Sequence, residues 1–239
     1  MGKGPNVSAL DQAKHTLYVP NNGPGGSGGN TGSGGTTVSL INTSTCNAVR
    51  PSGCHSPSPT AAVGNTPFGV TIAAGTVYAW NSREGTVSLI NAATCNAVKR
   101  ASCHKAKPTV TTGAADGPGG SNPRTHTVYA VDTDDDTVSV LDSAACNAHH
   151  TAGCPQIAPT LATGEQPDMV LSDPATDTLY VANTIDNTVS VFNGAACDAT
   201  HSSGCRRPAP SAAALSFSSP PTRQPTPSTV AASRSSRLT

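Results

Sequence analysis

Short runs of alternating apolar and polar residues recur along this chain, separated by clusters of glycine, proline, asparagine and serine. Four runs start with Thr-Val-Ser, at Thr37, Thr86, Thr137 and Thr188, and a run with a central tyrosine precedes each one, starting at Thr16, Thr76, Thr127 and Thr178. β-Branched and aromatic residues in such alternation predict β-strands. In the last three copies the two runs start 10 residues apart, and the polar residues between them predict a hairpin.

The runs belong to a longer repeat that occurs four times. Equivalent cysteines at 46, 95, 146 and 197 are 49, 51 and 51 residues apart. Each copy offers a further short apolar run before the tyrosine strand, clearest at 67–72 and 167–172, and an extended Pro-Thr segment at its end. Four short strands in about 50 residues match one blade of a β-propeller better than a turn of a solenoid. The predicted fold is therefore all-β, with four-stranded antiparallel blades.

The repeat sets the expected boundaries. Blade 1 covers 4–63 with a glycine-rich insertion at 21–35, and the others cover 64–112, 113–163 and 164–214. In blade 3 the first strand is replaced by Gly117-Pro-Gly-Gly-Ser121, so we expect the third sheet to be the poorest. The Pro/Ser-rich tail at 215–239 has the composition of a disordered segment.

The fourth copy resembles the YVTN family of β-propeller repeats. The resemblance is carried by Thr178-Leu-Tyr-Val-Ala-Asn183, by Thr188-Val-Ser-Val-Phe-Asn193 and by the step Gly164-Glu-Gln-Pro167, and it extends over about 4–210. Such propellers usually close with about seven blades, whereas four are present here. The resemblance thus implies an open or partial ring, and we expect the chain to be a piece of a longer propeller.

What the family implies about function is broad. It contains surface-layer and binding proteins and stands near propeller lactonases and lyases, so the resemblance implies a fold and no single activity. The leading hypothesis is a noncatalytic extracellular or cell-surface scaffold that binds a protein, glycan or small-molecule ligand through its loops. The alternative is a propeller enzyme of lactonase or lyase type with its site at the mouth of the channel.

All eight cysteines lie in four Cys-x7-Cys pairs. We predict a disulfide in each pair; free thiols and zinc are the competing interpretations. Zinc ligands usually lie two to four residues apart, and the histidines near these loops do not keep a fixed position. The predicted pairs are Cys46 with Cys54, Cys95 with Cys103, Cys146 with Cys154, and Cys197 with Cys205. Disulfides indicate an oxidising, extracellular compartment, although residues 1–10 contain no apolar signal segment.

The amino-acid composition limits the classes of binding partner. Lys and Arg number 14, Asp and Glu also 14, and charged residues make up 12%, which argues against binding to nucleic acid. No apolar stretch is long enough to predict a membrane span. Four of the eight aromatic residues, Tyr18, Tyr78, Tyr129 and Tyr180, occupy one repeat position, which favours packing between blades over a ligand-stacking ladder.

The sequence offers few candidate residues for catalysis or for binding a metal or cofactor. The loop from Asp132 to Asp136 could form a weak calcium site or, more simply, a solvated turn. Asp168 is a channel candidate without an equivalent in the other copies, while Asp11 and Asp173 align with Asn122 and suggest a turn. The glycines at 23–28 match a dinucleotide-binding pattern but lead into no predicted helix. The sequence therefore assigns no catalytic, cofactor-binding or metal-binding residue.

The repeat also predicts self-association. Four blades of a larger ring leave one face of the first blade and one face of the last without partners. We expect apolar residues there, among them Val38, Leu40, Val189 and Val191, to be partly uncovered.

Overall fold

The structure is a computed structural model that describes residues 2–24, 34–55, 58–105, 107–113 and 117–198, and the backbone of 209–212. Most of the glycine-rich insertion, the tail at 215–239 and Cys205 lie outside the described residues, so the expectations for them stay predictions. No helix within the described residues is both long and apolar enough to cross a membrane.

Four antiparallel sheets of four strands each form the chain, and each sheet follows the chain order of its strands. Their strands are β1 (Ala9–Asp11), β2 (Thr16–Asn21), β3 (Thr37–Asn42) and β4 (Thr60–Ala62); β5 (Pro67–Ala73), β6 (Thr76–Asn81), β7 (Thr86–Asn91) and β8 (Thr109–Thr111); β9 (Gly120–Asn122), β10 (Thr127–Asp132), β11 (Thr137–Asp142) and β12 (Thr160–Ala162); and β13 (Pro167–Asp173), β14 (Thr178–Asn183), β15 (Thr188–Asn193) and β16 (Ala209–Ala212). Two short 3₁₀ turns, η1 (Pro51–His55) and η2 (Ser82–Glu84), are the helical segments described.

The predicted fold class is confirmed, and so are the hairpins between the tyrosine and Thr-Val-Ser strands. Each such pair is six residues long and in full register, as in Thr178↔Asn193 to Asn183↔Thr188. The expectation for the third sheet is only partly met. Its inner strand β9 has three residues against seven in β5 and β13, but β1 is equally short.

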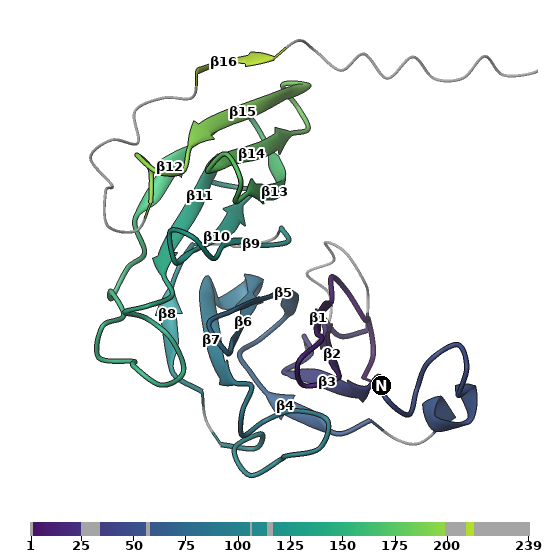
Figure 1. Ribbon diagram of the computed structural model, residues 1–239. Helices are drawn as coiled ribbons and strands as arrows, with labels where there is room; N and C mark the ends of the chain where they lie inside the picture. Colours follow the sequence, from purple (N-terminus) through teal and green to yellow (C-terminus); the bar gives the residue numbers. More distant parts are fainter. Residues whose placement is uncertain are drawn as a thin grey trace, which may run out of the picture.

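The four sheets follow one another around an arc (Figure 1). Strands β1, β5, β9 and β13 lie toward the common inner side of this arc, and the fourth strand of each sheet lies on the outside. We call the face of a blade that looks toward the next blade in the chain its forward face, and the opposite one its backward face.

The hydrophobic core lies between blades rather than within them. Side chains alternate across a strand, so each thin sheet must bury both faces against its neighbours. Each of the three core clusters combines the forward face of one blade with the backward face of the next. The first joins Tyr18, Val38 and Leu40 to Val77, Ile90 and Cys95; the second joins Tyr78, Val87 and Leu89 to Val128, Leu141 and Cys146; the third joins Tyr129, Val138 and Val140 to Leu179, Phe192 and Cys197.

This arrangement corrects one expectation. Val38 and Leu40 are buried, because they lie on the forward face of blade 1 and pack against blade 2. The alternation of apolar and polar residues shows which side chains lie on the same face of a sheet. It does not show which of the two faces packs against the neighbouring blade. The expectation for Val189 and Val191 on the forward face of blade 4 is met, since both are half-buried.

The tyrosines confirm the packing interpretation in three of four blades. The Tyr18 hydroxyl donates to the carbonyl oxygen of Cys95 at 2.9 Å, and the Tyr78 hydroxyl donates to that of Cys146 at 2.7 Å. Each bond therefore joins a blade to the first cysteine of the next blade. Tyr180 occupies the same position in blade 4 and is 41% exposed.

These buried hydroxyls predict an alkaline loss of stability. Burial raises the pKa of Tyr18, Tyr78 and Tyr129 above the ordinary value of 10.0, and Asp11 and Asp142 add to it at the first two. The folded state then keeps protons that the unfolded state releases, so stability is fully present below pH 10 and falls as the pH rises further. The urea midpoint should drop between about pH 9 and about pH 11.

The variant Tyr78→Phe should flatten that pH dependence by roughly a third, because it removes one of three buried hydroxyls. It should also lower stability at neutral pH by about 1–2 kcal/mol, since the carbonyl of Cys146 loses its donor. If Tyr78→Phe kept the pH dependence of the unmodified chain, Tyr78 would have the same pKa in the folded and unfolded states, which would contradict the prediction.

Candidate functional site

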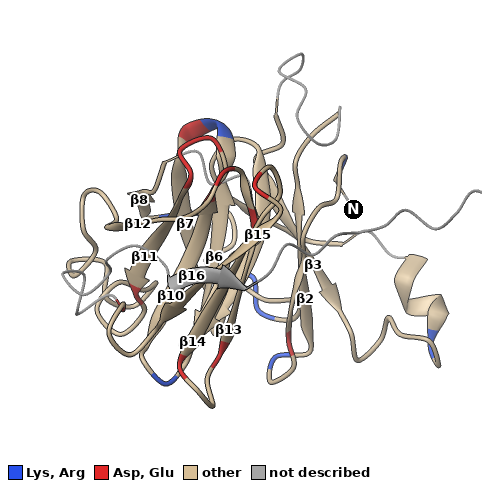
Figure 2. Ribbon diagram, turned by 90° about the horizontal axis from the view of Figure 1, so that it is seen from above, with Lys and Arg blue, Asp and Glu red and all other residues tan. Residues whose placement is uncertain are grey.

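The two ends of the sheets differ in chemistry. One end, here called the hairpin end, carries the second-to-third-strand loops at 82–85, 133–136 and 184–187 and the starts of the inner strands. Its acidic residues stand together in Figure 2, and they include Glu84, Asp134, Asp135, Asp136, Glu165 and Asp186. The opposite end, the disulfide end, carries the cysteine loops between the third and fourth strands.

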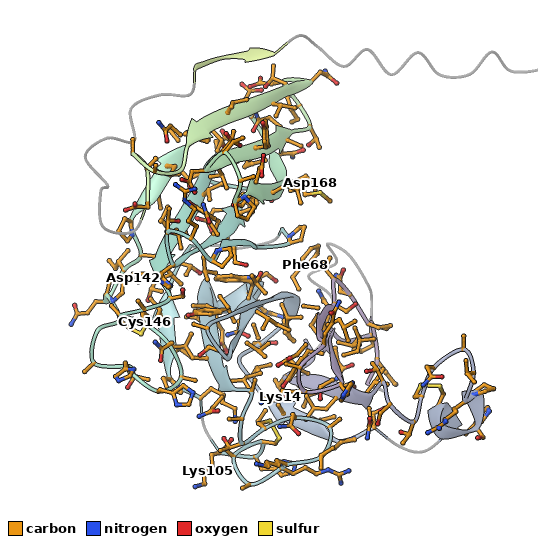
Figure 3. All side chains as sticks on the ribbon, viewed as in Figure 1. Lys14, Phe68, Lys105, Asp142, Cys146 and Asp168 are labelled. Atoms are coloured by element: carbon orange, nitrogen blue, oxygen red, sulfur yellow. A yellow bond between two sulfur atoms is a disulfide. The ribbon has the colours of Figure 1, made fainter. Side chains whose placement is uncertain are left out.

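Two inner strands are bulged at the hairpin end. The register shifts between Pro67 and Gly69 in β5, and between Pro167 and Met169 in β13, so Phe68 and Asp168 are the extra residues. A bulge re-aims its side chain and is common beside binding sites. In Figure 3 both residues lie on the inner side of the arc, Phe68 half-buried and Asp168 exposed.

Neighbouring blades place other residues at the bulge position. Asn6 follows Pro5 in blade 1, and Gly117 stands at the corresponding place in blade 3. An amide, a phenyl ring, a bare backbone and a carboxylate therefore follow one another along the inner side. The repeat thus varies here, whereas its framework positions stay alike.

The acidic loop of blade 3 does not gather its carboxylates. Asp132 is buried and accepts hydrogen bonds from Ser139 Oγ at 2.8 Å and Thr137 Oγ1 at 3.3 Å, while Asp136 Oδ1 accepts from the Gln166 amide at 2.8 Å. Asp134 and Asp135 are exposed. Within the described residues, no three His, Cys, Asp or Glu side chains converge as metal ligands.

The aligned residues Asp11, Asn122 and Asp173 confirm the turn interpretation. Asp11 accepts from the Lys14 amide at 3.0 Å, Asn122 from the Arg124 amide at 3.0 Å, and Asp173 from the Ala175 amide at 2.9 Å. The Thr176 hydroxyl bond and the Ala175 amide bond lower the pKa of Asp173. These three lie where β1, β9 and β13 end, at the disulfide end and far along the strand from the bulges.

A repeated polar triad was missed by sequence reasoning. Asn81 Nδ2 donates to Thr86 Oγ1 at 3.1 Å and to Ser88 Oγ at 2.9 Å, and Ser88 Oγ accepts from the Gly64 amide at 3.1 Å. The same bonds recur around Asn21 and Asn183. In blade 3 the direction is reversed, because Asp132 accepts from Thr137 and Ser139. The signal was present in the sequence, because Asn or Asp ends every tyrosine strand and Thr-x-Ser begins every following one.

The disulfide prediction is confirmed for three pairs. Cys46–Cys54, Cys95–Cys103 and Cys146–Cys154 are bonded, with Cα–Cα distances of 4.6, 4.9 and 4.3 Å. The pair Cys197–Cys205 stays a prediction, because Cys205 lies outside the described residues. Peptide mapping without reductant should link these two cysteines to each other.

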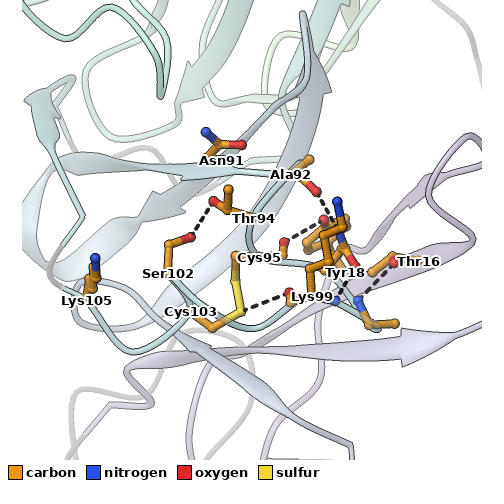
Figure 4. Close-up of a disulfide and its surroundings, with 12 residues drawn as sticks. Thr16, Tyr18, Asn91, Ala92, Thr94, Cys95, Lys99, Ser102, Cys103 and Lys105 are labelled. Carbon is orange, nitrogen blue, oxygen red and sulfur yellow. Dashed lines mark hydrogen bonds between the residues drawn. A yellow bond between two sulfur atoms is a disulfide. The ribbon is translucent and has the colours of Figure 1, made fainter.

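Each described disulfide loop after the first also contacts the preceding blade (Figure 4). Besides the bond from Tyr18 to Cys95, the Ala97 amide donates to Thr16 Oγ1 at 3.1 Å. The Ala148 amide repeats this with Thr76 Oγ1 at 3.0 Å. The second and third disulfide loops therefore each present a carbonyl oxygen that accepts from the tyrosine of the preceding blade and an amide that donates to its threonine.

Blade 3 has a hollow on its disulfide loop. It has a volume of about 510 Å³, is widely open to solvent, and is lined by Ala144, Ala145, His149, His150, Thr151, Ala152 and Gly153. Both histidines are exposed. The hollow offers a shallow surface rather than an enclosed site.

No family model and no curated protein matches the sequence. Among solved structures, the chain is similar to a putative 6-phosphogluconolactonase from Bacteroides uniformis, with a TM-score of 0.55 and 13% identity over 79% of this chain and 50% of that one. It is similar to streptogramin B lyase, with a TM-score of 0.52 and 9% identity over 81% of this chain and 53% of that one.

A third similar structure is hydrazine synthase of Kuenenia stuttgartiensis, with a TM-score of 0.54 and 15% identity over 79% of this chain and 45% of that one. At such identity the likeness shows the propeller fold alone. The chain spans about half the length of the solved structures it matches.

The disulfide end yields a prediction with a matched control inside the chain. All pairs close rings of the same length, which are each worth about 2.5 kcal/mol in the chain-entropy model. Cys95 and Cys103 are also buried against blade 1, whereas Cys54 is exposed and Cys46 half-buried. The double variant Cys95→Ala/Cys103→Ala should therefore lose about 1 kcal/mol more than Cys46→Ala/Cys54→Ala.

Urea unfolding of both double variants, at low protein concentration and neutral pH, measures the difference. Equal losses would contradict the view that the second loop is part of an inter-blade core.

Proposed function

We propose that this chain is a noncatalytic extracellular or cell-surface β-propeller scaffold of the YVTN repeat type, which binds a ligand at the hairpin end. The proposed units are 4–63, 64–112, 113–163 and 164–214. The ligand is a protein, glycan or small molecule that contacts the inner bulges and the adjoining loops.

One observation carries this proposal. The polar side chains that recur at fixed repeat positions are used by the framework: the asparagine triads bind strands together, and the tyrosines and threonines join neighbouring blades. The side chains left at the inner side differ from blade to blade. A surface with Asn6, Phe68 and Asp168 at the equivalent position of blades 1, 2 and 4 suits recognition, because it offers an amide, an aromatic face and a charge.

The proposed compartment rests on the disulfides. Three bonded pairs within the described residues suit an oxidising environment, and the balanced charge gives no basis for nucleic-acid binding.

A propeller enzyme of lactonase or lyase type is the second candidate. Its supporting observation is Asp168, an exposed carboxylate at a bulge on the inner side. General acid or base catalysis needs a positioned partner for the reacting group, and the described residues place no His, Asp or Glu beside Asp168 at the equivalent positions of blades 1 to 3.

Ring opening of glucono-δ-lactone separates the two candidates. A scaffold should give the same rate as buffer, and Asp168→Asn should leave that rate unchanged. Catalysed ring opening that is lost in Asp168→Asn would refute the scaffold proposal and establish the enzyme.

Binding provides the positive arm of the test. On a glycan microarray or in a titration with a ligand found there, Phe68→Ala should weaken binding about tenfold, because it removes the aromatic surface at the bulge. The control Val98→Ala changes an exposed apolar side chain on the disulfide loop of blade 2, at the opposite end of the sheets, and should bind as the unmodified chain does. Equal weakening by both variants would contradict a site at the inner bulges.

A further inference from the structure

The junction between blades 3 and 4 does not make a contact that the two earlier junctions make. Tyr18 and Tyr78 each donate their hydroxyl proton to the first cysteine carbonyl of the next blade. Tyr129 occupies the same position in blade 3 and is fully buried, yet its hydroxyl makes no hydrogen bond with the described residues. A buried hydroxyl without a partner is rare, and it indicates that a water molecule or an ion binds there.

The two threonines near Tyr129 cannot donate a proton to its hydroxyl. Thr125 donates its own to Thr127 Oγ1 at 3.0 Å, and Thr127 donates its own to the Thr125 carbonyl at 3.1 Å. Burial raises the pKa of Tyr129, both threonines lower it, and the carboxylates of Asp198 and Asp177 raise it further. The Tyr129 hydroxyl therefore lies within electrostatic reach of two acidic side chains.

Asp198 is a departure from the repeat at this junction. The residue after the first cysteine is asparagine in blades 1 to 3, and its Nδ2 donates to the carbonyl oxygen four residues earlier. The three bonds run from Asn47 to Thr43 at 2.9 Å, from Asn96 to Ala92 at 2.7 Å and from Asn147 to Ser143 at 2.9 Å. In blade 4 the corresponding pair is Asp198 and Gly194. A carboxylate has no proton to donate, so the repeat brings two acceptor oxygens together where the other blades have a hydrogen bond.

Gly194 also connects this pair to Tyr129. A Cβ atom placed on Gly194 would lie 3.6 Å from the Tyr129 hydroxyl oxygen. Asp198 is buried, with 7% of its surface exposed. A carboxylate, a backbone carbonyl and a phenol hydroxyl thus come together in the buried junction between blades 3 and 4.

Asp177 is a neighbour of these three oxygens and not one of them. Its Oδ1 accepts from Asn122 Nδ2 at 3.2 Å, and its Oδ2 accepts from Arg124 Nε at 3.1 Å. Both oxygens are therefore in use, and Arg124 balances the charge of Asp177.

We propose that the Asp198 carboxylate, the Gly194 carbonyl and the Tyr129 hydroxyl bind a calcium ion between blades 3 and 4. Calcium fits because every donor is an oxygen and because this ion accepts an irregular set of ligands that water completes. Magnesium demands a near-ideal octahedron, and zinc prefers histidine and cysteine. With a single carboxylate the site should be weak, with a Kd of about 10⁻⁴ to 10⁻³ M. The site does not depend on what the propeller binds.

Urea unfolding of the full chain tests the site, in EDTA and in about 10 mM calcium at the same ionic strength. Calcium should lower the equilibrium constant for unfolding about 10- to 100-fold, as the expected Kd requires. Asp198→Asn restores the asparagine of the other blades. It should therefore abolish the calcium effect and, in EDTA, be at least as stable as the unmodified chain.

The matched control is Asp173→Asn, which removes the same charge from a turn at the same end of the sheets. It should keep the full calcium effect. If Asp173→Asn loses the effect as completely as Asp198→Asn does, net charge and not this group of oxygens governs the response.

Terbium, which binds to calcium sites, gives a readout that a purely structural role would not move. Emission excited through tyrosine should appear when terbium is added to the unmodified chain, and calcium should displace it. Asp198→Asn should abolish this emission. Tyr129→Phe should weaken calcium binding about tenfold with an unchanged circular dichroism spectrum, because it removes only a ligand oxygen.

Three further results would overturn the proposal. Equal stability of the unmodified chain in calcium and in EDTA means that no calcium binds. A calcium effect that persists in Asp198→Asn means that the ion binds elsewhere. A stability that rises on acidification and does not respond to calcium means that a proton, and not an ion, joins Asp198 to Gly194.

Discussion

The packing of one blade against the next is the contact on which the rest of this structure depends. No sheet has a core of its own, because a single layer of strands has two apolar faces and nothing inside. All three core clusters span a pair of neighbours, and each brings a buried tyrosine from one blade to the first cysteine of the following blade. Stability is therefore shared between neighbours, as expected for a repeat architecture.

The disulfides contribute to this contact between blades. The long loop between the third and fourth strands, 92–108 in blade 2, would be costly to order by itself. The bond between Cys95 and Cys103 closes the loop, and its carbonyl and amide groups then meet Tyr18 and Thr16 in a fixed arrangement (Figure 4). Lys107 adds to the order of the same loop, since its ammonium donates to the carbonyls of Ser102 and Cys103 at 2.6 and 3.1 Å. The cross-link thus acts on the junction as well as on the unfolded chain.

The framework could be predicted from the sequence, because its residues recur at the same positions in four repeats. The candidate site could not be predicted in this way, since its residues differ from one repeat to the next. Recurrent spacing identified the strands, the hairpins, three disulfide pairs and the packing role of Tyr18, Tyr78 and Tyr129. It could not identify the bulges at Phe68 and Asp168, which depend on how an inner strand meets its neighbour. The burial of Val38 was misjudged for a related reason, since alternation defines two faces but not which of them meets the next blade.

Departures from the repeat are therefore the informative positions in this molecule. Where the contact pattern is complete, as around Tyr78, a polar group is satisfied within the framework and has no further chemistry to offer. Where the pattern is varied, as at Asn6, Phe68 and Asp168, the side chains differ in kind, and Phe68 and Asp168 lie on the inner side of the arc. The framework and the proposed recognition surface thus use different positions of one repeat, so the surface can change without disturbing the contacts between blades.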